Sequence, residues 1–470
     1  MIDLRNFTFT YHRAPAPTLR QVTLQVAEGE CVVICGRSGC GKTTLVRLLN
    51  GLVPHYYQGE YSGSAYVGGM NVEDAGPGSL ASVAGTVFQN PMSMFFTTAV
   101  DTELAFPLEN RGINREVIRD RVCDIATEVG AVDLLGKSIF KVSGGQRQRV
   151  AFGAALASRP RVLILDEPTS NLDGPSIEVM TELIAGAKRA GVAVVVAEHR
   201  LSYLMGVADR FIHMDEGGFV GEYTPAELSA VPEAERRTWG LRSLEKVRVS
   251  ELVEAKDLGS THGVGQGLVL EDLVVGYRKG MPLRYLGEKL CFEPGVVTGV
   301  LGANGIGKTC LARTLIGLEK PLKGSIFLGG RRMTPRGLRK NSSLVMQDVN
   351  HQLVESSVRA ELAFGASKEI ANLDAHLEDI ALQLGLYEFL DRHPQVLSGG
   401  QKQRLAVGVA ALSGRRIVVL DEPSSGLDYA HMIGVGEVAR WLAERGTIVV
   451  VVSHDAELLL RACGKIVNWG

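Results

Sequence analysis

Short runs of apolar, mostly β-branched residues alternate along the chain with longer stretches of helical period. Apolar runs without a polar face are typical of strands buried on both sides in a parallel sheet. The helical stretches at 115–129 and 177–189 separate such runs, as the crossovers of β-α-β units require. The pattern therefore predicts an α/β fold. The expected strands are 31–34, 162–165, 192–197, 296–300, 417–420 and 448–452.

The chain is a repeat, because the motifs of its first half recur in the same order in its second half. From Ser143 with Ser398 to His199 with His454, the two copies align without a gap. Two copies of this length indicate a duplicated domain and not a solenoid of short repeats. The predicted boundaries are 1–235 for the first domain, 236–267 for a polar, glycine-rich linker and 268–470 for the second domain.

One repeated motif stands between an expected strand and a helical run. It reads Gly36-Arg-Ser-Gly-Cys-Gly-Lys-Thr43 and recurs as Gly302-Ala-Asn-Gly-Ile-Gly-Lys-Thr309. Glycines at this spacing let backbone N–H groups surround phosphates at a helix N-terminus, where the dipole also favours anions. The lysine of each loop would reach the β and γ phosphates, and the threonine after it would hold Mg²⁺. We expect the two cysteines to serve packing and not redox chemistry. The predicted nucleotide-binding residues are Gly36, Ser38, Gly39, Cys40, Gly41, Lys42, Thr43 and Thr44, and Gly302, Asn304, Gly305, Ile306, Gly307, Lys308, Thr309 and Cys310.

A second motif is an apolar run that ends in two acids, at residues 162–167 and 417–422. A carboxylate at the end of a buried strand is unfavourable unless a cation or a metal compensates it. Asp166 and Asp421 are therefore predicted to bind Mg²⁺. The next residue points to the other side of the strand. There the carboxylates of Glu167 and Glu422 could accept a proton from an attacking water.

A third motif, Val142-Ser-Gly-Gly-Gln-Arg-Gln-Arg149, recurs as Leu397-Ser-Gly-Gly-Gln-Lys-Gln-Arg404. It resembles the signature of ATP-binding cassette (ABC) ATPases, and both copies show the family's order of phosphate loop, glutamine, signature, Asp-Glu pair and histidine. The resemblance implies two tandem P-loop NTPase domains. Each would have a mostly parallel sheet core, an antiparallel β subdomain and an α-helical subdomain, and would bind ATP and Mg²⁺.

In this family two cassettes enclose two nucleotides, and each phosphate loop faces the signature of the other cassette. Both motif sets are complete here, so the resemblance implies two hydrolysing sites, which we call site one and site two after the copy that supplies the phosphate loop. The implied catalytic residues are Gln89, Glu167 and His199 in the first copy, and Gln347, Glu422 and His454 in the second. The implied Mg²⁺ ligands are Thr43, Gln89 and Asp166, and Thr309, Gln347 and Asp421. The implied signature contacts to ATP are Ser143, Gly144, Gly145 and Gln146, and Ser398, Gly399, Gly400 and Gln401.

Two tyrosines are weaker markers. Tyr11 and Tyr277 precede the loop lysines at the same distance in both copies. In the family an aromatic residue here stacks on adenine. Their alternative interpretation is that of ordinary strand tyrosines.

Composition limits the class of protein. Fifty basic and 52 acidic residues give a net charge of −2, so no electrostatic footprint for nucleic acid is present. Seven cysteines without a C-x-x-C pair favour a reducing cytoplasm. No secretory signal is evident, and the apolar runs are too short to span a bilayer. Transport would therefore require separate integral membrane subunits.

The segment after Gln89, the run Asn50-Gly-Leu-Val-Pro-His-Tyr-Tyr-Gln-Gly-Glu60 and the run Glu198-His-Arg-Leu201 are similar to ATPases of energy-coupling factor (ECF) importers. The resemblance implies a peripheral ATPase on the cytoplasmic face of the membrane. Its partners would be a transmembrane coupling protein and a protein that captures a vitamin or metal ion. Met92, Met94, Phe95 and Phe96 would suit the docking groove, with core packing as the alternative.

Two other functions stay open from the sequence. One is the ATPase of a sugar or oligopeptide importer, although tandem ATPases of the sugar type commonly have one impaired site. The other is a soluble ABC protein acting on ribosomes or DNA, a class usually marked by inserted coiled coils, metal-binding cysteines or basic tails. None of these marks is evident in the sequence.

Overall fold

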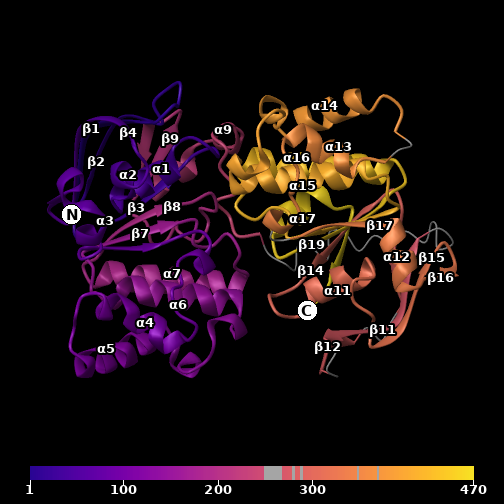
Figure 1. The fold of residues 1–470 in the computed structure, drawn as a ribbon, viewed down its shortest axis with the longest axis horizontal. Helices are drawn as coiled ribbons and strands as arrows, with labels where there is room; N and C mark the ends of the chain where they lie inside the picture. The colour runs from indigo at the N-terminus through magenta and orange to yellow at the C-terminus, as the bar shows by residue number, and fades with distance from the viewer. Residues whose placement is uncertain (248–266, 278–280, 286–288, 347–348, 368–369, 470) are drawn as a thin grey trace. The chain divides into compact units, whose positions relative to one another are not determined.

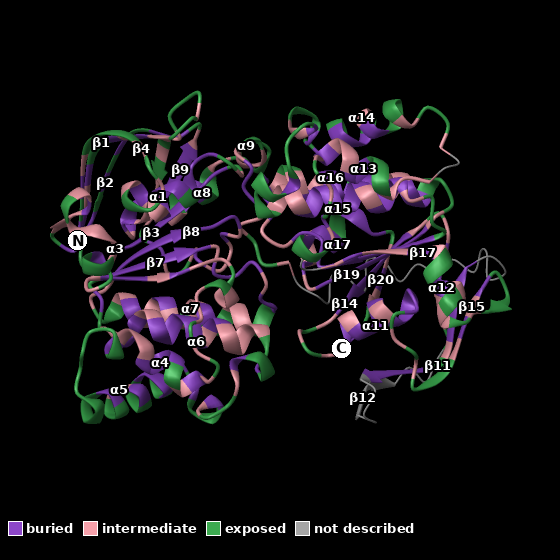
Figure 2. Ribbon diagram, in the orientation of Figure 1, coloured by how far each residue is buried: buried purple, intermediate pink, exposed green. Residues whose placement is uncertain are grey.

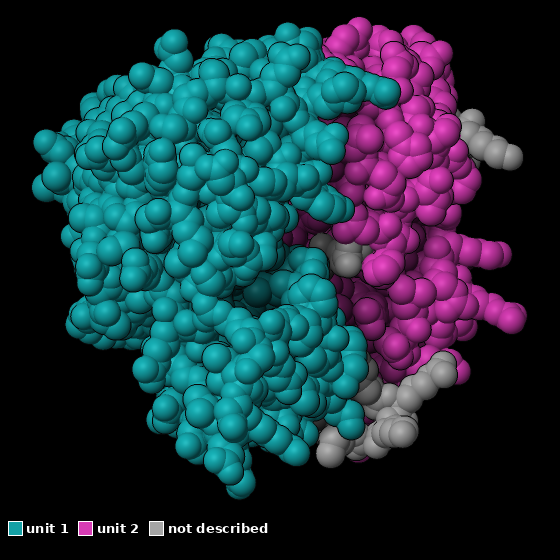
Figure 3. Space-filling model, turned by 60° about the vertical axis from the view of Figure 1, so that its left-hand side comes forward, with its two compact units in different colours: residues 1–246 teal, residues 247–470 magenta. Residues whose placement is uncertain are grey.

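The computed structural model describes residues 1–247, 267–277, 281–285, 289–346, 349–367 and 370–469. It divides into two compact units, Met1–Lys246 (unit 1) and Val247–Gly470 (unit 2) (Figures 1 and 3). Most of the predicted linker, residues 236–267, lies outside the described residues, and the predicted domain boundaries stay a prediction. Among the described residues, no helix is long and apolar enough to cross a membrane.

The centre of unit 1 is a six-stranded sheet in the order β10-β9-β3-β8-β7-β6. All its pairs are parallel except β9 with β10. Every residue of β3, β7 and β8 is buried, which is the burial expected of strands covered on both faces (Figure 2). The strands are β3 (Cys31–Cys35), β6 (Ala84–Val87), β7 (Val162–Asp166), β8 (Ala193–Ala197), β9 (Arg210–Asp215) and β10 (Gly218–Tyr223).

An antiparallel sheet and a group of helices complete unit 1. The antiparallel sheet has the order β2-β1-β4-β5 and shares one apolar core with a face of the central sheet. The helices α4, α5 and α6 pack in a second core on the other face. The sheet consists of β1 (Ile2–Tyr11), β2 (Leu19–Val26), β4 (Gly59–Val67) and β5 (Met70–Asn71). The helices of the unit are α1 (Lys42–Leu49), α2 (Leu52–His55), α3 (Val72–Leu80), α4 (Val100–Glu109), α5 (Arg115–Glu128), α6 (Gly144–Ala157), α7 (Gly174–Arg189), α8 (Pro225–Ala230) and α9 (Glu233–Thr238), with 3-10 turns Pro91–Ser93, Val132–Leu134 and Ile139–Lys141.

Unit 2 repeats this plan. Its five-stranded sheet, in the order β17-β18-β19-β14-β20, is parallel throughout. Its antiparallel sheet has the order β12-β11-β15-β16, and β13 also pairs with β11. The strands are β11 (Leu268–Tyr277), β12 (Met281–Tyr285), β13 (Leu290–Phe292), β14 (Val297–Leu301), β15 (Lys323–Leu328), β16 (Arg331–Arg332), β17 (Ser342–Val345), β18 (Ile417–Asp421), β19 (Ile448–Ser453) and β20 (Lys465–Asn468).

The helices of unit 2 are α11 (Lys308–Leu315), α12 (Pro335–Asn341), α13 (Val358–Gly365), α14 (Leu373–Gln383), α15 (Gly399–Leu412), α16 (Tyr429–Glu444) and α17 (Ala456–Ala462), with 3-10 turns Val349–His351, Tyr387–Phe389 and Pro394–Val396. Equivalent helices begin alike in the two units. Asp173 caps α7 by accepting the N–H of Ser176 at 3.1 Å, and Asp428 caps α16 by accepting the N–H of His431 at 2.9 Å. The predicted α/β architecture, with a parallel core, an antiparallel sheet and a helical part in each half, is confirmed.

Candidate active site

The phosphate loop of unit 1 joins the end of β3 to the start of α1. Gly36, Gly39 and Gly41 all have positive φ, and a Cβ on Gly36 would lie 2.1 Å from the carbonyl oxygen of Met214. Only glycine fits that contact. No side chain caps the start of α1, where the first N–H groups of a helix have no acceptor within the helix itself. This is the backbone arrangement that the sequence predicts for phosphate binding.

The loop lysines are buried and turn back onto their own loops. Nζ of Lys42 donates to the carbonyl oxygens of Gly36 and Arg37, both at 2.9 Å. Nζ of Lys308 donates to the carbonyl oxygen of Gly302 at 2.6 Å. A buried ammonium needs such acceptors, and a phosphate group could replace them with full charges.

The two loop cysteines are buried thiols. Cys40 lies 5% exposed and Cys310 2% exposed. Burial raises the pKa of both thiols above the ordinary value of 9.0. A raised thiol pKa lowers the reactive thiolate fraction at neutral pH. These positions fit the packing interpretation.

Asp166 and Asp421 end the central strands β7 and β18. In each, the Oδ1 atom is buried without a hydrogen-bond partner among the described residues. Burial and the adjacent Glu167 carboxylate raise the pKa of Asp166 to about 7, and burial and Glu422 raise that of Asp421 to about 6. A buried oxygen without a donor suits a divalent cation, so these carboxylates fit the predicted Mg²⁺ role. When bound, Mg²⁺ would neutralise charge on the carboxylate and the phosphates.

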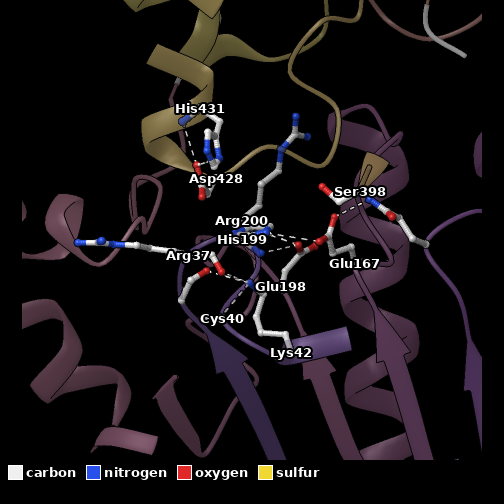
Figure 4. A network of polar contacts seen from close by, with 12 residues as sticks. Arg37, Cys40, Lys42, Glu167, Glu198, His199, Arg200, Ser398, Asp428 and His431 are labelled. Carbon is white, nitrogen blue, oxygen red and sulfur yellow. Dashed lines mark hydrogen bonds and ion pairs between the residues drawn. The ribbon is translucent and has the colours of Figure 1, made fainter. Parts of the chain in front are cut away.

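Glu167 follows Asp166 in a left-handed backbone conformation with φ of 44°. This conformation is rare for a residue with a side chain and is often found at functional sites. Its Oε2 accepts a hydrogen bond from Nε2 of Gln89 at 2.7 Å. Its Oε1 lies 3.4 Å from Nε2 of His199 (Figure 4). Unit 1 therefore brings together the glutamine, the acid and the histidine that the sequence predicts for one site.

Glu422 is also left-handed, with φ of 51°, but its partners differ. Its carboxylate lies 3.3 Å from Nζ of Lys308 and 2.9 Å from Nδ1 of His454, and it accepts a hydrogen bond from Ser453 at 2.8 Å. Burial alone would raise the pKa of Glu422, but the His454 imidazole and then the Lys308 ammonium hold it at about 2. Gln347, the predicted glutamine of this site, lies outside the described residues.

The two signatures are helix starts with the same geometry. Ser143 accepts the N–H of Gln146, whose side chain accepts the N–H of Ser143, and α6 begins from this capping box. Ser398 and Gln401 form the same box at α15. Gly144 and Gly399 have open space where a Cβ would stand. The completion of each site by the signature of the other copy stays a prediction.

Tyr11 lies at the end of β1 and is tied to α1. Its hydroxyl lies 3.0 Å from Oγ1 of Thr44, and Arg47 donates to it at 3.1 Å. Tyr11 and its neighbours line a hollow of about 320 Å³ that also includes Arg13 and Glu60. This position beside the first turn of α1 is compatible with the predicted adenine contact. Tyr277 ends β11, the corresponding strand of unit 2.

A segment after β10 returns to the phosphate loop of unit 1. Nε of Arg37 donates to the carbonyl oxygen of Thr238, at the end of α9, at 2.8 Å. The next residue, Trp239, stacks on His213 with ring centroids 4.5 Å apart. The residue of unit 2 that corresponds to Arg37 is Ala303, which has no side-chain donor. Sequence reasoning missed this connection, because nothing in the motif relates Arg37 to Thr238.

Glu198 is a second group that sequence reasoning left without a role. It is 2% exposed, and burial and the Glu167 carboxylate raise its pKa. The available signal was a charged residue directly at the end of the apolar run 193–197, beside the predicted histidine. Charged residues are almost never fully buried unless they are paired.

Comparison with known proteins identifies the family. The family model described as ABC transporter matches residues 19–170 and 287–425. An ABC transporter ATP-binding protein of Treponema denticola is 39% identical over 99% of this chain and 94% of its own length, and one of Methanosarcina acetivorans is 32% identical over 99% of this chain and 84% of its own length. The chain therefore belongs to the ABC transporter family, with two ABC ATPase domains.

A solved structure shows the same fold. The archaeal ribosome recycling factor, in a crystal with a ribosomal stalk protein, covers 98% of this chain and 87% of its own, with a TM-score of 0.64 and 22% identity. At this identity the likeness concerns the fold alone.

Proposed function

We propose that this chain is the ATPase of an ECF-type importer, with Mg²⁺-ATP sites at Lys42 and Lys308. It would work at the cytoplasmic face of the membrane and drive uptake of a vitamin or metal ion through separate membrane subunits. The roles proposed for the site residues are those implied by their motifs. Glu167 and Glu422 act on the attacking water, Asp166 and Asp421 hold Mg²⁺, and the glutamines and histidines orient the γ-phosphate and water.

The observation that carries the proposal is an exposed aromatic ring after Gln89, stacked on a partly buried one. Phe96 is 75% exposed, and its ring is stacked on that of Phe106 with centroids 4.9 Å apart. Met92, Met94 and Phe95 are partly buried against the core of the unit, so packing accounts for much of their surface. An exposed aromatic ring that is held in place by a second ring is a suitable anchor for a groove in a partner.

The loop that presents Phe96 is held by a buried carboxylate. Glu103 on α4 is 3% exposed and accepts the N–H groups of Phe96 at 3.1 Å and Thr97 at 2.8 Å. Such bonds fix the loop before a partner arrives, which reduces the entropy lost on binding.

Unit 2 has the same device with different side chains. Glu361 is 2% exposed and accepts the N–H groups of Val354 at 2.8 Å and Glu355 at 2.7 Å. Val354 and Phe364 are each 70% exposed. Two similar loops, one aromatic and one aliphatic at its tip, favour two docking faces that recognise different parts of a membrane subunit.

The experiment is co-expression with the membrane proteins encoded beside this gene, followed by purification in detergent. We expect the wild-type chain to co-purify with a membrane subunit and Phe96→Ser to lose most of it. The ATPase activity of the free variant should stay within about twofold of wild type, because Phe96 lies outside the nucleotide site. Val117→Ser, which changes a 57% exposed residue on α5, is the matched control.

The other functions are outcomes of the same experiment. Co-purification with the permease of a sugar or oligopeptide importer would replace the ECF assignment and retain transport. ATPase activity stimulated by ribosomes or DNA, without any membrane partner, would overturn the importer proposal.

A further inference from the structure

The residues beside the histidine differ between the two units. Unit 1 reads Glu198-His-Arg200, and unit 2 reads Ser453-His-Asp455. The carboxylate therefore precedes the histidine in one copy and follows it in the other. The two copies align without a gap from the signature to the histidine, so these positions correspond residue by residue. After the histidine, unit 2 continues into α17 (Ala456–Ala462), whereas the aligned residues of unit 1 form turns.

In unit 1 the carboxylate of Glu198 joins two segments of the site. One oxygen accepts hydrogen bonds from the hydroxyl of Thr169 and, at 3.1 Å, from that of Tyr203. The other accepts the N–H of His199 at 2.8 Å. Thr169 is 0% exposed and lies in the turn after Glu167. Figure 4 shows Glu198 between the histidine segment and the acid.

In unit 2 the equivalent hydroxyl is bound by the carboxylate that follows the histidine. Ser424 corresponds to Thr169 and donates to Oδ2 of Asp455 at 2.5 Å. The other oxygen of Asp455 accepts the N–H of Leu458 at 3.3 Å at the start of α17. The hydroxyl of Ser453, in the place of Glu198, donates to Glu422.

The two arrangements thus connect the same two segments by a carboxylate displaced by two residues. A carboxylate buried this deeply is unfavourable unless its oxygens are satisfied by donors. Four donors on Glu198 supply that compensation, the fourth being the N–H of Arg200 at 3.5 Å, and all of them belong to the two segments that carry the proposed catalytic groups. Small displacements of such groups lower catalytic rates strongly.

We propose that Glu198 is a positioning residue of site one, which ties the segment of His199 to the turn after Glu167 and replaces Asp455 of unit 2 in that role. The proposal rests on the proposed hydrolytic roles of His199 and Glu167. It also makes the two sites chemically different, because a carboxylate in site one stands where site two has a hydroxyl bonded to its catalytic acid.

The first test measures ATP turnover of the full chain with Glu422→Gln, so that hydrolysis reports on site one. Glu198→Ala should lower kcat by about tenfold to a hundredfold and leave KM for ATP within about twofold. The double change Glu198→Ser with Arg200→Asp, which installs the pattern of unit 2, should restore kcat to within about threefold of the parent. Glu182→Ala, an exposed acid on α7, is the control.

The second test measures amide hydrogen exchange at residue 199 without nucleotide. Exchange should become faster in Glu198→Ala and return toward the parent rate in the double change, because the carboxylate installed at position 200 would again join this segment to the hydroxyl of Thr169. In Glu198→Gln, which keeps the side-chain shape and one acceptor oxygen, the exchange rate at residue 199 should lie between those of the parent and Glu198→Ala. This variant keeps the test decisive if the alanine variant unfolds.

Unchanged kcat in Glu198→Ala would overturn the proposal, even if exchange became faster. The proposal would also be overturned if kcat and the melting temperature both fell in Glu198→Ala and kcat did not recover in the double change. Glu198 would then have a purely structural role. If the Glu422→Gln parent hydrolyses no ATP, the proposed hydrolysis at site one fails, while the exchange measurements still decide whether Glu198 ties the two segments.

Discussion

The ammonium of Lys308 lies 3.3 Å from the carboxylate of Glu422, and both side chains are at most 7% exposed. In unit 1 the described contacts of Lys42 are to the loop carbonyls and Cys40, and Glu167 is held by Gln89. The proposed phosphate-binding lysine and the proposed catalytic acid are therefore paired in unit 2. A phosphate that enters site two must compete with that carboxylate for the ammonium.

Glu422→Gln should raise the affinity of site two for ATP, because the substitution removes this competing charge. Binding is measured by titration of ATP into the chain with Lys42→Ala, which leaves site two as the high-affinity site. We expect Kd to fall by about threefold to tenfold, the range for one weakened ion pair. An equal or weaker affinity would show that the pair does not restrain Lys308.

The double variant Glu167→Gln with Glu422→Gln should bind ATP and turn it over about 10²–10³ times more slowly. The amide keeps the shape of each side chain but cannot accept the proton of the attacking water. Phosphate release measures turnover, and equilibrium binding of labelled ATP shows whether the variant still binds the nucleotide. Wild-type turnover in the double variant is incompatible with the proposed catalytic role of these two residues.

Gly36→Ala should destabilise unit 1 by more than about 3 kcal/mol, because its Cβ would meet the Met214 carbonyl oxygen at 2.1 Å. Gly302→Ala should be milder, since the nearest atoms there are side-chain carbons of Ile306 at 3.2 Å and Trp469 at 3.4 Å. Gly78→Ala, with no atom within 4 Å, is the control. Chemical unfolding followed by circular dichroism measures the loss of stability in each variant and so ranks the three substitutions. Equal losses for Gly36→Ala and Gly78→Ala would contradict the close contact at Gly36.

The stability of the nucleotide-free protein should depend on Asp166 through pH. Burial and Glu167 raise the pKa of this carboxyl from 3.8 to about 7, so between these values the folded state binds more protons than the unfolded state. The stability contributed by the protonated Asp166 carboxyl is fully present below about pH 3.8 and is lost as pH rises to about 7. Asp166→Asn, always neutral, should melt above wild type by a margin that grows from pH 5 to pH 8.

The measurement is a set of melting curves in EDTA at pH 5, 6.5 and 8. Asp120→Asn, an exposed acid on α5, serves as the control and should follow wild type throughout. Addition of Mg²⁺ and ATP should raise the melting temperature of the wild-type protein more than that of Asp166→Asn, because an ionised carboxylate is the better ligand. A pH-independent difference between the two curves would rule out the raised pKa.

The sequence predicted the central strands well because their pattern is local. The expected strands at 31–34, 162–165 and 417–420 appear as β3, β7 and β18, each extended by one residue. Continuous apolar runs with breakers leave few alternatives once the chain is known to be α/β. The motifs likewise located the phosphate loops, the acid pairs and the histidines in both copies, although their roles stay proposals.

What the sequence could not predict are contacts between distant segments. The partners of Glu167 and Glu422 differ although both copies read Asp-Glu, because those partners come from residues about 30 to 110 positions away. The replacement of Asp455 by Glu198 is invisible in a motif search, since the two carboxylates occupy different motif positions. Only the three-dimensional structure shows that both reach the same hydroxyl.

The packing around the phosphate loops also equips the chain with optical reporters. Trp239 stacks on His213 next to the segment held by Arg37, and Trp469 lies against Gly302 at the start of the second loop. Of the three tryptophans in the chain, only Trp441, on α16, stands apart from these two positions. With Trp441 and one of the others replaced by phenylalanine, the emission of the remaining indole would follow the occupancy of one nucleotide site at a time.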